Sequence, residues 1–152
     1  MESAPFTFRL ERVRTLRERA EEAAREELAR ELSHRLRGEA MLQEATRLAS
    51  AARTAGRDTV LGSGASGADL LAAQAWMERV ERRRLDAAGD LERRDAEVAR
   101  SREALAEAAR EREAIERLKR RRRADHDAEM LRRAQTSLDE IALTVHRRGS
   151  AA

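Results

Sequence analysis

Three histidines, His34, His126 and His146, are the side chains of this sequence best suited to metal binding or proton transfer. None has a second histidine three or four residues away, the spacing that places two imidazoles on one face of a helix. Asp125 and Asp127 flank His126, but immediate neighbours on a helix point to different sides. The chain has no cysteine for thiol chemistry or metal binding. We therefore expect no metal site, no cofactor and no enzymatic activity.

Glycine and serine are concentrated in one short segment that contains Gly56, Gly62, Ser63, Gly64, Ser66 and Gly67. The segment lacks the GxxxxGK[ST] order of a phosphate-binding loop and does not follow a convincing strand. Glycine destabilises helices, so these residues predict a turn between two helices. Ser66 or Asp69 is suited to cap the helix that follows, because a short side-chain oxygen can accept from the free amides of its first turn.

The composition is that of long amphipathic helices, with 40% charged and 2% aromatic residues. Phe6, Phe8 and Trp76 are the only aromatic side chains, too few to fill a globular interior. The 32 basic and 29 acidic residues alternate as Arg/Glu pairs, which solubilise helix surfaces. No apolar run reaches the roughly 20 residues that span a bilayer, and the first residues lack the apolar core of a signal peptide. Together with the absence of cysteine, this predicts a cytoplasmic protein.

Two segments show helical periodicity. Between Asp69 and Val145 there is no proline and one glycine, and apolar residues recur at steps of three and four: Leu70, Ala73, Met77, Val80, Ala87, Leu91, Val98, Leu105, Ala108 and Ile115. Upstream, a second apolar face comprises Phe8, Val13, Leu16, Ala20, Ala24, Leu28, Leu32, Leu36, Met41, Leu42, Ala45, Leu48 and Ala52. Several steps of four make this face drift relative to a strict heptad. Gly38 is a weak point in this helix.

These patterns predict an all-α fold, a long antiparallel two-helix coiled-coil hairpin with an overhanging C-terminal helix. We expect a single domain over residues 1–152, with a helix over about 6–57, a turn over about 58–68 and a helix over about 69–147. If the turn centres near residue 63, Phe8 lies opposite Lys119, and about 30 residues after it have no partner in the first helix.

The overhang begins with a basic run, Lys119, Arg120, Arg121, Arg122 and Arg123, and continues with apolar residues at heptad spacing, Leu131, Ala134, Leu138, Ile141 and Val145. Large bare apolar surfaces mark interaction sites, so this overhang predicts a protein-binding element. Self-association into a homodimeric coiled coil is one alternative. Nucleic-acid binding is another, although consecutive basic residues spread around the whole helix and no aromatic residue is near to stack on a base.

Trp76 is the only large aromatic residue in the second helix and stands one position before Met77. It either packs beside the seam of the hairpin or anchors a partner, because tryptophan is enriched among residues that dominate binding energy.

The order of these features resembles the FliJ family, the small coiled-coil component of the bacterial flagellar type III export apparatus, which is related to YscO-type injectisome proteins. The similarity rests on the phenylalanine-led start, on the turn near residue 60, and on Leu118 and Lys119 followed by Gln135 and the segment Leu138-Asp139-Glu140-Ile141-Ala142. It covers nearly the whole chain and leaves open whether the apparatus is flagellar or an injectisome.

The resemblance implies a fold like the γ stalk of rotary ATPases and a non-enzymatic role. FliJ members insert into the hexameric export ATPase (FliI), promote its assembly and contact the export gate protein FlhA, and export chaperones are further candidate partners. The expected gate contacts are Trp76 and Val80. The expected ATPase contacts are Lys119, Arg120, Arg121, Arg122, Arg123, Leu131, Gln135, Leu138, Asp139, Ile141 and Val145. The resemblance thus implies a cytoplasmic protein that is peripheral at the inner membrane only through its partners.

Overall fold

The computed structural model describes residues 5–149 and contains two helices, α1 (Glu11–Leu61) and α2 (Gly67–Gly149), with no strand in that range. The expected all-α fold of two long helices packed against each other is confirmed. The contacts gather in two units. Unit 1 holds the described residues up to Glu21 together with α2 from Ala108 onward, and unit 2 is Glu22–Glu107. The assignment of the whole chain to one domain stays a prediction.

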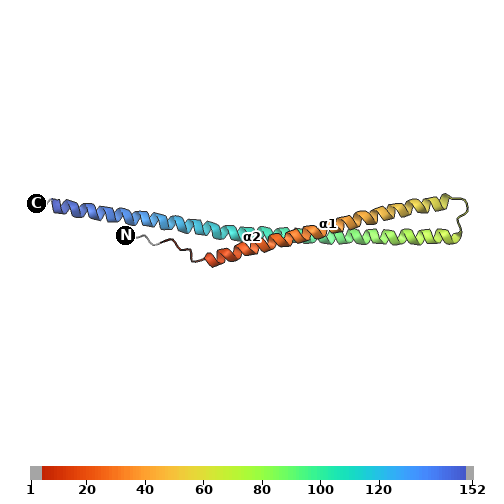
Figure 1. The fold of residues 1–152 in the computed structure, drawn as a ribbon, viewed down its shortest axis with the longest axis horizontal. Helices are drawn as coiled ribbons and strands as arrows, with labels where there is room; N and C mark the ends of the chain where they lie inside the picture. The colour runs from red at the N-terminus through yellow and green to blue at the C-terminus, as the bar shows by residue number, and fades with distance from the viewer. Residues whose placement is uncertain (1–4, 150–152) are drawn as a thin grey trace. The chain divides into compact units, whose positions relative to one another are not determined.

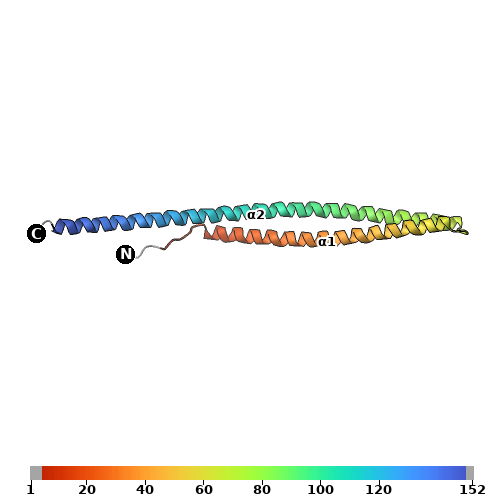
Figure 2. The same cartoon turned by 90° about the horizontal axis from the view of Figure 1, so that it is seen from above.

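Unit 2 is a helical hairpin. Its segments of α1 and α2 run antiparallel and are joined by the turn where the colours pass from yellow to green (Figures 1 and 2). Gly64 adopts a φ of 118°, a left-handed conformation that glycine tolerates. At the start of α2, the Asp69 amide donates to Ser66 Oγ (3.2 Å) and the Ser66 amide donates to Asp69 Oδ2 (2.9 Å). The Ser66 hydroxyl also donates to Asp69 Oδ2 (2.7 Å), and this bond, followed by that from the Ser66 amide, lowers the pKa of Asp69.

The helix boundaries differ from the expected ones by a few residues. Helix α1 begins at Glu11 instead of about residue 6, because residues 5–10 form a non-helical strap against α2. The Glu11 amide donates to the Phe8 carbonyl (3.1 Å) and the Arg14 amide to the Leu10 carbonyl (2.9 Å), which starts the helix there. Helix α1 continues to Leu61 instead of about residue 57, and α2 begins at Gly67, just after Ser66.

Small side chains form the core of unit 2. Ala49 and Ala52 of α1 pack against Val80 of α2, and Met77 lies against this cluster. Gly56 extends the close approach, because a Cβ added there would lie 2.8 Å from Met77 Sδ. Alanine and glycine bury little apolar area, so the two backbones must come close for this core to exclude water.

Gly38, which the sequence indicates as a weak point, lies within α1 and is buried. A Cβ at this position would lie 2.7 Å from Arg94 Cδ, and the Arg94 guanidinium donates to the His34 carbonyl at 3.0 Å. The glycine therefore provides the space through which an arginine of α2 crosses α1.

The apolar face expected on α1 is partly wrong, because Leu16, Leu36 and Met41 are exposed. Each step of four residues overshoots a full helical turn by about 40°, so a series of such steps rotates out of the contact face. The pattern on α2 holds better: Val80 and Val98 are buried, while Leu70 is exposed. Arg84, Arg94 and Ser101 occupy further seam positions of α2 and are half-buried.

Candidate protein-binding surfaces

The three histidines do not form a site. His34 and His146 are exposed, and His126 is half-buried beside the strap. Residues 5–149 contain no group of three or more His, Cys, Asp or Glu side chains that could hold a metal ion. None of the helices in this range is long and apolar enough to cross a membrane.

A network of ion pairs joins α1 to α2 in unit 1. Glu11 accepts from Lys119 Nζ at 3.0 Å and from Arg14 Nε at 2.8 Å, and Arg14 also donates to Glu116 at 3.0 Å. The hydrogen bond from Lys119, followed by that from Arg14, holds the pKa of Glu11 below its usual range. The pKa of Arg14 is raised, chiefly by Glu116 and then by Glu11. Charged side chains therefore hold together the end of the helix pair where α1 begins.

One pair of this region has a buried carboxylate. The Glu21 side chain is only 6% exposed and accepts from Arg112 Nε, while Arg17 and Glu111 form a second link nearby at 2.5 Å. The sequence pattern of alternating Arg and Glu indicated solvated surface pairs and did not single out Glu21. The sequence did contain one indication of this pair. Arg112 falls four residues after the apolar seam residue Ala108 and three before Ile115, so its spacing places it at a seam position of the second helix.

The strap closes over α2 with its two phenylalanines. Phe8 is buried, and Lys119 Nζ lies 5.9 Å from the centroid of its ring. The Phe6 ring meets the His126 ring edge-on, with centroids 5.6 Å apart. The expected pairing of Phe8 with Lys119 is confirmed.

The residues of the basic run, Lys119 to Arg123, differ in their exposure and in their partners. Lys119 is half-buried and occupied by Glu11 and Phe8, whereas Arg120, Arg121, Arg122 and Arg123 are exposed. Arg122 lines a groove beside Phe6 and His126, and Arg123 Nε lies 4.0 Å from Asp127. Lys119 is thus a structural residue of unit 1 as well as an expected ATPase contact, and the four arginines remain accessible.

The end of α2 presents the apolar residues of the overhang to solvent. We call Leu131, Ala134, Leu138, Ile141 and Val145 the arm stripe; all five are exposed, with Leu138 at 65%. Gln135 and Asp139, also expected as ATPase contacts, are exposed beside them. In unit 1, the blue part of α2 continues beyond the described part of the strap without a neighbouring helix (Figures 1 and 2). Of the side chains described from Leu131 to Arg148, only Ser137 is half-buried.

Trp76 and Val80, the two expected gate contacts, differ in their exposure to solvent. Trp76 is 44% exposed and carries the Arg79 guanidinium carbon 5.9 Å from its ring centroid. Val80 is 3% exposed and belongs to the core with Ala49 and Ala52. The expected gate contact therefore stays a prediction for Trp76, whereas Val80 does not reach the surface.

Two packed helices, pairs of opposite charge and an exposed apolar helix face are together the features of a coiled-coil protein. The comparisons agree with this class: the family described as flagellar FliJ protein matches residues 6–151. The match covers nearly the whole chain, so the chain belongs to the FliJ family and is a component of the flagellar export apparatus. Searches of curated proteins and of solved structures gave no match.

Proposed function

We propose that this chain is the stalk-like, non-enzymatic coiled coil that inserts into the hexameric export ATPase, promotes its assembly and links it to the export gate. The observation that carries the proposal is the arm stripe, whose apolar side chains are exposed along the end of α2. In this role the protein is cytoplasmic and is held at the inner membrane only by its partners. The gate protein, and export chaperones, are the further partners that the family suggests.

The arm stripe supplies affinity that depends little on salt. Full burial of each aliphatic side chain contributes about 1.5–3 kcal/mol, from which the costs of association must be subtracted. Arg120 to Arg123 lie just before the stripe and favour a negatively charged ring surface. Rim charges of this kind act mainly on the rate of association and lose influence as salt rises.

Trp76 is the proposed contact to the gate, because a half-exposed tryptophan on a charged helix is suited to anchor a partner. Val80 supports this contact only indirectly, by holding α2 against α1 one turn away.

The test replaces one leucine of the stripe and compares it with a leucine elsewhere on the same helix. Leu138 and Leu143 are 65% and 57% exposed, but they are five residues apart and so point in different directions around α2. Leu138→Asp should abolish stimulation of the organism's export ATPase and formation of its ring, whereas Leu143→Asp should leave both largely intact. Both variants should keep the helical content and melting temperature of the free protein, because neither side chain is packed.

The heptad spacing of the arm stripe also suits a second copy of the chain, which makes a homodimeric coiled coil the second candidate function. Sedimentation of the same variants separates the two. ATPase stimulation that survives Leu138→Asp, or a free protein that falls from dimer to monomer with this change, would favour the homodimer.

A further inference from the structure

The turn end of unit 2 exposes aliphatic side chains that neither the hairpin core nor the proposed contacts use. Leu61 is 82% exposed, and Val60, Leu70 and Leu71, which flank the turn in the sequence, are exposed as well. The glycines and serines of the turn would be sufficient to reverse the chain, so the turn itself does not require these four residues. Exposed apolar clusters of this kind mark interaction surfaces.

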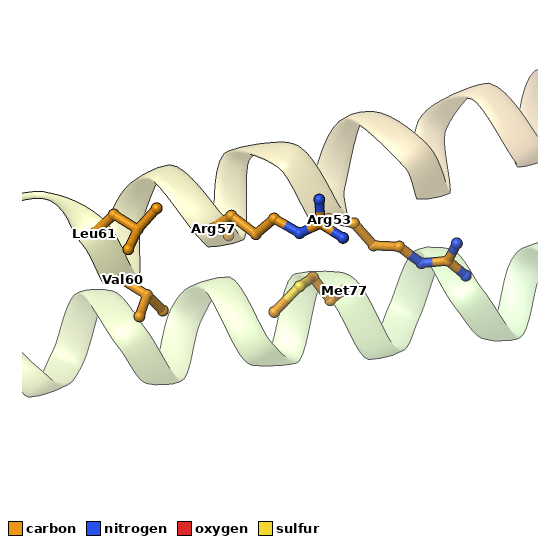
Figure 3. Close-up of a pocket in the computed structure, with 6 residues that line it drawn as sticks. Arg53, Arg57, Val60, Leu61 and Met77 are labelled. Atoms are coloured by element: carbon orange, nitrogen blue, oxygen red, sulfur yellow. The ribbon is translucent and has the colours of Figure 1, made fainter.

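Two of these residues, Val60 and Leu61, line a groove of about 380 Å³ together with Arg53, Gly56, Arg57 and Met77. We call it the tip groove; Figure 3 shows Val60 and Met77 between the two helices, and Arg53 and Arg57 extending from α1. Met77 approaches α1 closely because Gly56 has no side chain. A thioether is flexible and polarizable, so this floor can adapt to different apolar side chains.

The charged side chains that line the tip groove are both cationic. Arg53 is held in place by Glu81, whose carboxylate accepts its hydrogen bond at 2.8 Å. Arg57 is exposed, and no ion pair engages it among residues 5–149. An apolar floor beside a fixed and a free guanidinium is complementary to an apolar side chain flanked by carboxylates.

We propose that the tip groove binds an amphipathic, acidic helix of another protein. The apolar face of that helix lies along the groove between α1 and α2, where a third helix can pack on two, and its carboxylates pair with Arg57. This contact uses residues that the ATPase and gate proposals leave unassigned, so it can fail while those proposals hold.

The experiment titrates isotope-labelled full-length protein with a synthetic amphipathic peptide that has leucines three and four residues apart and glutamates elsewhere. A matched peptide carries lysines in place of the glutamates. The acidic peptide should shift the resonances of Val60, Leu61 and Met77 saturably, and the basic peptide should not. Leu61→Ser and Arg57→Glu should each weaken binding about tenfold or more, the change that 1.4 kcal/mol produces.

Leu36→Ser is the matched control, since Leu36 is an exposed leucine of α1 that does not line the groove. All three positions are exposed, so the variants should remain folded. Equal binding of the two peptides, absence of saturable shifts, or equal weakening by Leu36→Ser would overturn the proposal. It would also be overturned if Leu61→Ser abolished self-association or binding to anionic lipid vesicles while peptide binding was absent.

Discussion

The same two helices are held together by different forces in the two units. In unit 2 the buried part of the contact is apolar and consists of Ala49, Ala52 and Val80, while ion pairs such as Arg53 with Glu81 lie in more exposed positions. In unit 1 the contact consists largely of ion pairs, with Phe8 as the buried apolar residue. Apolar contacts change little with pH and salt, whereas charge pairs depend on both. We therefore expect unit 2 to be the more robust part of the hairpin and unit 1 the more responsive part.

The largest effect should come from a charge in the core of unit 2. Val80→Asp places an unpaired carboxylate at a position that is 3% exposed, and we expect a loss of about 3–5 kcal/mol in the free energy of unfolding. Trp76→Ala is the companion variant: it should leave stability nearly unchanged and weaken binding to the gate protein. Denaturant unfolding and a gate-binding assay on both variants measure this. If Trp76→Ala were as destabilising as Val80→Asp, Trp76 would be a residue of the hairpin core.

The next effect concerns Glu21, the buried member of an ion pair in unit 1. Glu21→Ala removes the partner of Arg112, whose side chain keeps partial access to water, so we expect a loss of about 2 kcal/mol, below the range for a fully buried pair. Glu22→Ala is the control, because Glu22 is exposed and pairs with Arg25 at the surface. Its cost should be below about 1 kcal/mol. Equal costs for the two variants would show that burial of Glu21 adds nothing to stability.

The smallest effect that we expect is a decrease in the stability of unit 1 at acidic pH, caused by protonation of Glu11. The pKa of Glu11 in the folded protein lies below its ordinary value of 4.5. Its ionised form therefore stabilises the fold above about that pH, and this contribution disappears as the pH falls through the lowered pKa. Glu11→Gln should flatten the decrease in stability of unit 1 in acid.

Hydrogen exchange can follow the amides of each unit separately as the pH is lowered. Glu81 of unit 2 also has a lowered pKa, caused mainly by Arg84, so unit 2 should show its own acid dependence that Glu11→Gln leaves unchanged. A Glu11→Gln protein with the wild-type acid profile in unit 1 would contradict the assignment.

Much of the fold could be predicted from periodicity together with local residue types. The turn, the cap at Ser66 and the pairing of Phe8 with Lys119 follow from local residue types and from counting along two helices. The exposure of the arm stripe follows from the unequal lengths of α1 and α2. These features depend on helix geometry, which the sequence specifies locally.

The errors have a common physical origin, since they concern which side of a helix the partner covers. Leu16 and Leu36 are apolar and yet exposed, whereas Glu21 is charged and yet buried, because Arg112 faces it from a distant part of the sequence. The packing role of Gly38 could not be predicted for the same reason, because it depends on Arg94, and its weakness within the helix stays a prediction. Residue type alone cannot reveal a pair whose members are brought together only by folding.

The four exposed arginines, Arg120 to Arg123, follow one another without interruption. Successive helical positions are about 100° apart, so together they present positive charge in every direction around the axis of α2. In the proposed role, a ring closed around this segment would meet positive charge at every angle of rotation, so the charge would attract the helix without selecting one orientation. The arm stripe lies on one side of α2, so the six subunits of the proposed hexameric ring could not all contact it at once, and the six-fold symmetry would be lost there.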